Sequence, residues 1–83
     1  MSYAVVWSVR ATSLAARYLD DDPAGLAQVL DAADLLADHP NPAGAFQYGS
    51  ENLLRIRVGR YRLLYEISPE GNVITIIHVG RIA

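Results

Sequence analysis

Three arginines on two neighbouring segments of this sequence are spaced to bind a phosphodiester. Arg55 and Arg57 alternate with apolar residues, and Arg62 follows Gly59-Arg60, a two-residue turn with glycine where a type II′ turn needs positive φ. This turn predicts a hairpin that places Arg57 opposite Arg62 and Arg55 diagonally from it. Like charges in these positions disfavour a sheet by about 0.2–1 kcal/mol. Because arginine binds phosphate oxygens bidentately and keeps its charge, the cluster predicts a face that binds phosphate and stabilises a phosphorane-like transition state.

Two further side chains on this face can move protons. If the last hairpin pairs Ile67 with Val73, His78 comes opposite Arg62, where a neutral imidazole beside cations can serve as a base. Glu66 follows Arg62 by four residues on the same alternating segment and therefore shares its face. The sequence thus predicts His78 and Glu66 as candidate bases.

The same residues have a plainer interpretation, which the sequence leaves open. Arginines also decorate solvated sheet faces or pair with a carboxylate such as Glu66, and a histidine near a strand end is often without chemistry. Trp7, Tyr61 and Tyr65 can in principle stack on bases. The last two, however, alternate onto an apolar face, which predicts that they belong to the core.

Two helices are expected before the arginine hairpin. A strand over Tyr3–Ser8 ends at Ser8, a good N-cap, and apolar residues at i, i+3, i+4 and i+7 predict a helix that ends near Asp20. Asp22-Pro23 then caps a second helix that runs to about His39. The acidic run that includes Asp22 fits a capping turn better than a metal site.

The rest of the chain predicts strands. Residues 41–52 have the composition of a loop. Three alternating segments follow, at Leu53–Val58, Tyr61–Ile67 and Val73–Val79. The fold class is therefore α+β: an N-terminal strand, a two-helix hairpin and a three-stranded antiparallel meander that form one sheet in a single domain, 1–83.

Composition narrows the class of protein. The 83 residues contain no cysteine, which excludes disulfides and thiolate metal sites and favours the cytoplasm. The first nine residues lack the features of a signal peptide, and no apolar run approaches the length of a membrane span. The net charge is −2, yet six of nine acids lie in residues 20–38 and five of seven arginines in residues 55–81, so the C-terminal half is the basic one. This polarity favours a nucleic-acid contact on one side, and no metal or cofactor is implied.

Residues 53–67 (LLRIRVGRYRLLYEI) resemble the central signature of RelE/ParE toxins of type II toxin–antitoxin systems, a basic alternating strand that turns at glycine into a Tyr-Arg-x-x-Tyr strand. Residues 40–44 resemble the family's Pro/Gly linker, and residues 76–81 resemble its final strand. The order of strand, two helices and three strands covers essentially the whole chain. The resemblance implies a RelE-like fold and a cognate antitoxin protein as partner.

In the RelE branch, the resemblance further implies a ribosome-dependent endoribonuclease that cuts mRNA in the ribosomal A site by attack of a 2′-hydroxyl on the adjacent phosphate. Arg55, Arg57 and Arg62 occupy the matching basic positions. Arg81 lies within one residue of the basic position that follows the family's Val-Gly pair. These four residues are the catalytic candidates that the resemblance implies.

The sequence departs from the family pattern in two respects. Relatives usually continue to a second basic residue and to a tyrosine or histidine that assists the reaction, whereas this sequence ends at Ile82-Ala83. Many relatives also carry lysines where this chain has arginines. Because arginine does not give up its proton near neutral pH, proton abstraction is expected to fall to Glu66, His78 or the ribosome.

Two other functions fit the same resemblance. A ParE-like inhibitor of DNA gyrase shares the fold and needs no hydrolytic residues. A degenerate member would only bind its antitoxin, whose acidic or amphipathic segment would stabilise so small a domain.

Overall fold

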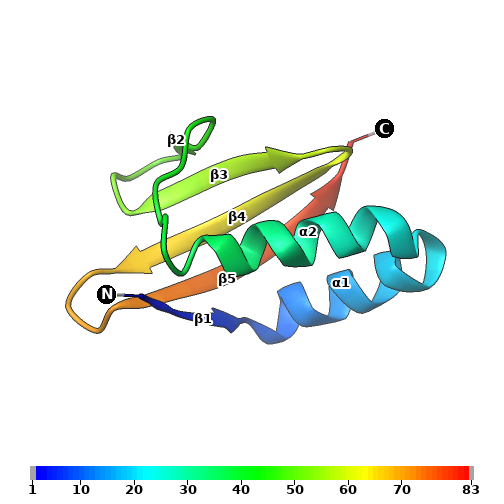
Figure 1. Ribbon diagram of the computed structural model, residues 1–83, viewed down its shortest axis with the longest axis horizontal. Helices are drawn as coiled ribbons and strands as arrows, with labels where there is room; N and C mark the ends of the chain where they lie inside the picture. The colour runs from blue at the N-terminus through cyan, green and yellow to red at the C-terminus, as the bar shows by residue number, and fades with distance from the viewer. Residues whose placement is uncertain (1, 83) are drawn as a thin grey trace.

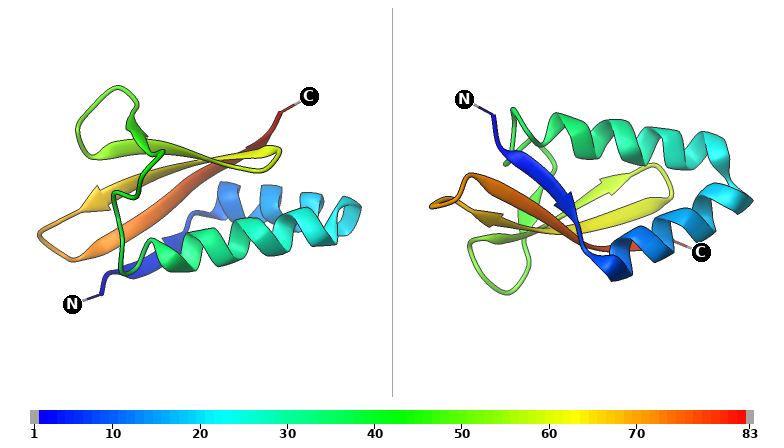
Figure 2. Two further views of the ribbon diagram at one scale, coloured as in Figure 1. Left: turned by 45° about the horizontal axis from the view of Figure 1, so that its top comes forward. Right: turned by 90° about the horizontal axis from the view of Figure 1, so that it is seen from below.

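The computed structural model describes residues 2–82, which form one five-stranded sheet with two helices packed on one of its faces (Figures 1 and 2). The strand order across the sheet is β1-β5-β4-β3-β2. The elements are β1 (Ala4–Trp7), α1 (Val9–Asp21), α2 (Pro23–Leu35), β2 (Phe46–Gln47), β3 (Leu53–Val58), β4 (Tyr61–Ser68) and β5 (Val73–Arg81). The predicted α+β fold class is confirmed.

Both helices begin at the predicted caps. The Ser8 Oγ accepts a hydrogen bond from the Ala11 amide at 3.0 Å, and the Asp22 carboxylate accepts one from the Gly25 amide at 3.2 Å. Each bond satisfies an amide of the first turn that has no partner inside the helix. Asp22 also ends α1, so a single residue makes the corner of the helical hairpin.

The second helix is shorter than predicted. Regular α-helix ends at Leu35 rather than near His39, and the chain continues through tighter turns in which the amides of Ala37 and Asp38 bond to carbonyls three residues back. The physical reason is Pro40, which has no N–H to donate to the Leu36 carbonyl and whose ring would clash with that carbonyl in a regular helix. In residues 2–82, neither helix is long and apolar enough to cross a membrane.

The arginine hairpin has the predicted register. Val58 pairs with Tyr61 and Arg57 with Arg62, and Gly59 has a φ of +60° in the turn between the strands. Two pairings could not be foreseen. β1 lies parallel to β5, and the predicted loop 41–52 contains the short strand β2, in which Phe46 pairs with Arg55.

The β4–β5 register differs from the prediction. Val73 pairs with Ser68 instead of Ile67, and the pairing shifts by one more residue between Leu64 and Tyr65. His78 therefore lies opposite Leu64, and Gly80 rather than His78 lies opposite Arg62. The displacement is two residues in total, so His78 stays on the arginine face because side chains alternate with period two.

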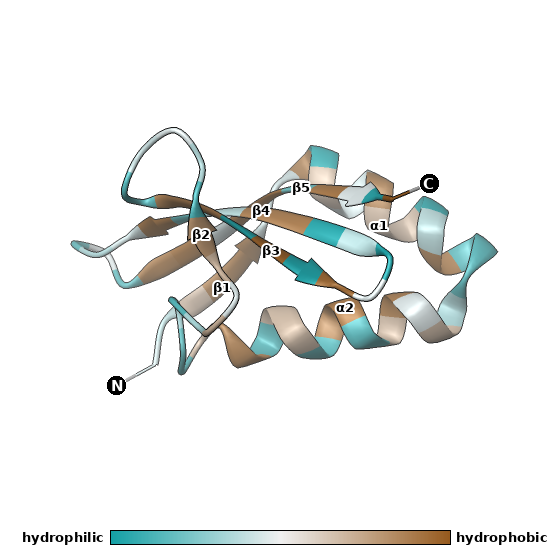
Figure 3. Cartoon of the chain, turned by 90° about the horizontal axis from the view of Figure 1, so that it is seen from above, coloured by the Kyte–Doolittle hydropathy of each residue, from teal (hydrophilic) through white to brown (hydrophobic). Residues whose placement is uncertain are grey.

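The core lies between the sheet and the helices. Tyr61 and Tyr65 belong to it, at 1% and 0% exposure, as their alternation predicted. The Tyr65 hydroxyl donates a hydrogen bond to the Pro40 carbonyl at 2.9 Å, and burial raises the pKa of Tyr65 to about 12. The opposite face carries the arginines, and Figure 3 shows hydrophilic bands on β3 and β4 near the turn that joins them.

Candidate functional site

A shallow hollow of about 220 Å³ opens on the sheet face that carries no helix. Its lining includes four of the predicted site residues, Arg55 from β3, Arg62 from β4, and His78 and Arg81 from β5. The complete lining is Tyr48, Arg55, Arg62, Leu64, His78, Gly80, Arg81 and Ile82. Guanidinium groups and an imidazole thus border one space large enough to hold a phosphate group.

Gly80 keeps this space open. It pairs with Arg62, so on the β5 side no side chain stands directly opposite that arginine. A Cβ added to Gly80 would lie 3.5 Å from Nε2 of His78, which shows that the imidazole lies beside the backbone of Gly80. The imidazole of His78 therefore lies near the position opposite Arg62, although the His78 backbone is two residues before Gly80 on β5.

Arg55 and Arg62 have no carboxylate partner in the part of the chain that the structure describes. One form of the plainer interpretation, an ion pair between these arginines and Glu66, is absent from residues 2–82. Arg62 is exposed and Arg55 half-buried. Their charges are consequently available to an anion in the hollow.

Arg55 is held by two aromatic rings instead. Its guanidinium carbon lies 4.8 Å from the ring centroid of Phe46 and 5.0 Å from that of Tyr48, both within cation–π range. Sequence reasoning missed these aromatics because they lie in a stretch with the composition of a loop. The available signal was their i, i+2 spacing, which is typical of a strand.

Arg57 lies beside the hollow rather than in its lining. The side chain is exposed, and its Nε donates a hydrogen bond to the Gly59 carbonyl at 3.0 Å. This contact directs the guanidinium along its own strand toward the turn. Arg57 nevertheless stays opposite Arg62, so it adds positive charge at the edge of the hollow.

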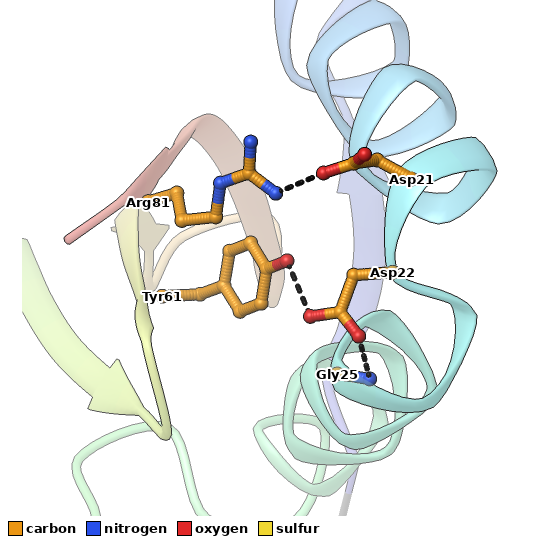
Figure 4. A network of polar contacts seen from close by, with 5 residues as sticks. All are labelled: Asp21, Asp22, Gly25, Tyr61 and Arg81. Atoms are coloured by element: carbon orange, nitrogen blue, oxygen red, sulfur yellow. Dashed lines mark hydrogen bonds and ion pairs between the residues drawn. The ribbon is translucent and has the colours of Figure 1, made fainter. Parts of the chain in front are cut away.

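The Arg81 side chain points toward Asp21 at the end of α1 (Figure 4). Its guanidinium forms an ion pair with Asp21 and lies 4.9 Å from the ring centroid of Tyr18, both on α1. Hydrogen bonds to Asp21 and to Tyr61 raise the pKa of Arg81 above its ordinary value. The residue borders one end of the hollow, but its charged group is engaged with the helix.

A second contact ties the helical hairpin to the sheet. The Tyr61 hydroxyl donates a hydrogen bond to Asp22 at 2.8 Å (Figure 4). This bond and the one from the Gly25 amide lower the pKa of Asp22, while burial and the same contact with Asp22 raise the pKa of Tyr61. The pair holds the hairpin corner against β4, on the opposite face of the sheet from the hollow.

Glu66 is not brought to the hollow. It lies four residues beyond Arg62, about 13 Å along the strand at roughly 3.3 Å per residue. Glu66 is exposed and borders a separate depression with Ser50, Asn52 and the β4–β5 turn. Of the two candidate bases, only His78 lines the same space as the arginines.

Comparison with known proteins agrees with this architecture. Residues 5–82 match the family model of the ParE toxin of type II toxin–antitoxin systems, ParDE. A search of curated protein sequences gave no significant match.

Several solved structures superimpose on the whole chain. A chain of the RelBE2 toxin–antitoxin complex from Mycobacterium tuberculosis is 28% identical with a TM-score of 0.78, and the match covers 98% of this chain and 99% of that one. The archaeal RelE–RelB complex from Pyrococcus horikoshii gives 24% identity, a TM-score of 0.82 and coverage of 98% and 96%. The isolated E. coli RelE toxin is 21% identical with a TM-score of 0.83, and the match covers 99% of this chain and 86% of that one.

These likenesses confirm the RelE-like fold that the sequence predicted. The family model spans the chain from β1 to the end of β5, including both arginine strands. The protein belongs to the RelE/ParE family and is a toxin of a type II toxin–antitoxin system.

Proposed function

We propose that this toxin is a ribosome-dependent endoribonuclease that cuts mRNA. The observation that supports this most is the hollow on the open sheet face, where the guanidinium groups of Arg55 and Arg62 meet the imidazole of His78. Two cations that have no carboxylate partner within residues 2–82 suit a phosphodiester, and the imidazole supplies the proton acceptor that arginine lacks.

In the proposed reaction, the 2′-hydroxyl of one nucleotide attacks the adjacent phosphorus atom. The bond from phosphorus to the 5′-oxygen of the next nucleotide breaks, which leaves a cyclic phosphate and a 5′-hydroxyl. Arg55 and Arg62 bind the non-bridging oxygens, whose negative charge increases in the transition state. His78 takes the proton of the 2′-hydroxyl, and water supplies a proton to the leaving 5′-oxygen.

The other candidates take lesser parts in this proposal. Glu66 lies too far along β4 to reach a phosphate held by Arg62, so we assign the base to His78. Arg57 guides the mRNA backbone from the edge of the hollow. Arg81 would have to leave Asp21 to bring its charge to the phosphate, and we assign it a supporting role.

A cognate antitoxin is the proposed partner in the cell. The likeness to chains of the RelBE2 complex and of the archaeal RelE–RelB complex supports this. A domain of 83 residues gains stability from any partner that binds only its folded state.

Inhibition of DNA gyrase is the second candidate. The family model that matches residues 5–82 is that of ParE toxins, and this favours a gyrase-directed function of the same fold. Such an inhibitor would not need the imidazole in the hollow, so the two functions differ in their dependence on His78.

Induced expression with mapping of mRNA ends tests the proposal. Wild-type toxin should arrest growth and produce cuts at A-site codons. Arg62→Ala should lose both effects, and Arg57→Ala should weaken both. Arg17→Ala, which removes an arginine from α1, is the matched control and should act like wild type. Arrest without cuts, together with loss of gyrase supercoiling activity, would move the assignment to gyrase. Absence of arrest in a protein that still binds its antitoxin would leave an antitoxin-binding module.

A further inference from the structure

Two half-exposed aromatic side chains stand on the open sheet face next to the hollow. Phe46 is 50% exposed and Tyr48 is 49% exposed, although both are large enough to contribute to a core. They follow the i, i+2 spacing of a strand, and Phe46 pairs directly with Arg55. Neither ring belongs to the hydrophobic core of residues 2–82 or packs against it.

The two rings fix the guanidinium of Arg55. Both centroids lie within 5.0 Å of its central carbon, and Arg55 has no ion pair in residues 2–82. An arginine stacked on rings keeps its charge and its outward hydrogen-bond donors. Phe46, Arg55 and Tyr48 therefore form one continuous cationic and aromatic surface.

This surface continues into the hollow. Tyr48 belongs to the hollow's lining together with Arg55 and Arg62, whereas Phe46 does not. The Tyr48 backbone is held by a hydrogen bond from its amide to the Leu53 carbonyl at 2.8 Å. A half-exposed ring on an anchored backbone thus stands beside the site where we put the phosphate.

The geometry points to a base-stacking subsite in which Tyr48 receives the base of a nucleotide whose phosphate is held by Arg55 and Arg62. This inference rests on the proposed RNA substrate. Proteins hold single-stranded RNA by combining cations for the backbone with aromatic rings for the bases. Phe46 is a positioning residue that keeps Arg55 and Tyr48 together. Because every base offers a π-face, the subsite selects for the presence of a base more than for its identity.

RNA binding by the purified toxin tests the subsite. The probe is a short fluorescent RNA with 2′-O-methyl groups, which cannot be cleaved, and its partner is the same oligonucleotide with abasic nucleotides at the central positions. Tyr48→Leu should weaken binding of the complete RNA by about tenfold, the effect of losing one stacked base. Binding of the abasic RNA should not change, which also shows that the variant is folded. Tyr48→Phe, which keeps the ring, should retain most of the affinity.

Three results would overturn the subsite. Wild-type toxin that binds the complete and the abasic RNA equally well, or binds neither, has no base subsite. Tyr48→Leu with wild-type affinity shows that the ring is not used. Equal weakening for both RNAs shows that Tyr48 acts only through Arg55. Failure of the endonuclease proposal can be told apart from these results. In that case the toxin would bind complete RNA more tightly than abasic RNA and yet leave ribosome-bound mRNA uncut.

Discussion

Replacing Arg62 by glutamine should make the toxin more stable and less active at once. Arg62 is exposed, has no carboxylate partner in the described residues and lies directly opposite Arg57. The Arg57 guanidinium is tethered to the Gly59 carbonyl at the same end of the hairpin. The folded state therefore places two like charges on paired residues, a repulsion that the unfolded chain largely relieves and that Arg62→Gln removes.

The gain can be estimated from the pairing. Removing one of two like charges opposite each other in a sheet is worth about 0.2–1 kcal/mol. With an unfolding entropy of about 2.1 cal/mol/K per residue, this corresponds to a rise in melting temperature of about 1–6 °C for a chain of this size. Activity should fall by about 10²–10³-fold, because one donor to the transition-state charge is lost.

Thermal denaturation and mRNA cleavage would be measured on the same preparations. The stability gain should shrink at 1 M salt, where the Debye length is about 3 Å. Arg17→Gln makes the same change in net charge on α1, where no arginine faces it across a sheet, and should show neither effect. A destabilised Arg62→Gln variant would refute the charge argument. A stabilised variant with full cleavage activity would refute the role of Arg62 in the site.

Four further outcomes are expected. His78→Gln should lower the cleavage rate by about 10²–10⁴-fold while leaving the affinity for uncleavable RNA nearly unchanged, and a parallel loss of affinity would argue against a proton-transfer role. Tyr65→Phe should lower the free energy of unfolding near pH 7 by about 0.5–1.5 kcal/mol through loss of the bond to the Pro40 carbonyl. The folded-state pKa of Tyr65 is raised from 10.0 to about 12, so wild type should also lose stability as the pH rises through this range. In urea melts at several pH values, the free energy of unfolding should fall by about 1–2 kcal/mol less in Tyr65→Phe than in wild type, after allowance for solvent screening. Ser8→Ala should cost about 1–2 kcal/mol in the same melts, with Ser8→Thr close to wild type.

Local sequence signals predicted the arginine hairpin because its register depends on few residues. A two-residue turn with Gly59 leaves a single antiparallel pairing that keeps Leu63 and Leu54 on the core face. Ser8 and Asp22 were equally clear, since a cap acts through amides two or three residues away. Features encoded within a few residues were therefore accessible from the sequence.

Features that depend on residues far apart in the chain could not be predicted from local sequence signals. The direction of Arg81 is set by Asp21, which is sixty residues earlier in the chain. β2 has only two residues, and its pairing with β3 cannot be read from a stretch with the composition of a loop. Tyr48 was missed for the same reason, although it borders the hollow. Loop composition alone did not reveal the aromatic part of the site.

The position of His78 depends on an irregularity that alternation cannot predict. Strict alternation from Ile74 and Ile76, both fully buried, would turn His78 into the core. The shift in the β4–β5 pairing leaves Ile77 without a partner on β4, so Val79 takes the next buried position and His78 emerges on the arginine face. Bulges often redirect side chains beside active sites.

Ser8 connects this irregularity to the helical layer. Its hydroxyl caps α1 and also donates a hydrogen bond to the carbonyl of Ile77 at 3.1 Å, while its amide bonds to the Ile76 carbonyl at 2.9 Å. The extra residue in β5 thus keeps a hydrogen-bond partner for its carbonyl, as a buried backbone requires. A residue that sequence reasoning recognised only as a helix cap therefore also stabilises the bulge that brings the imidazole to the hollow.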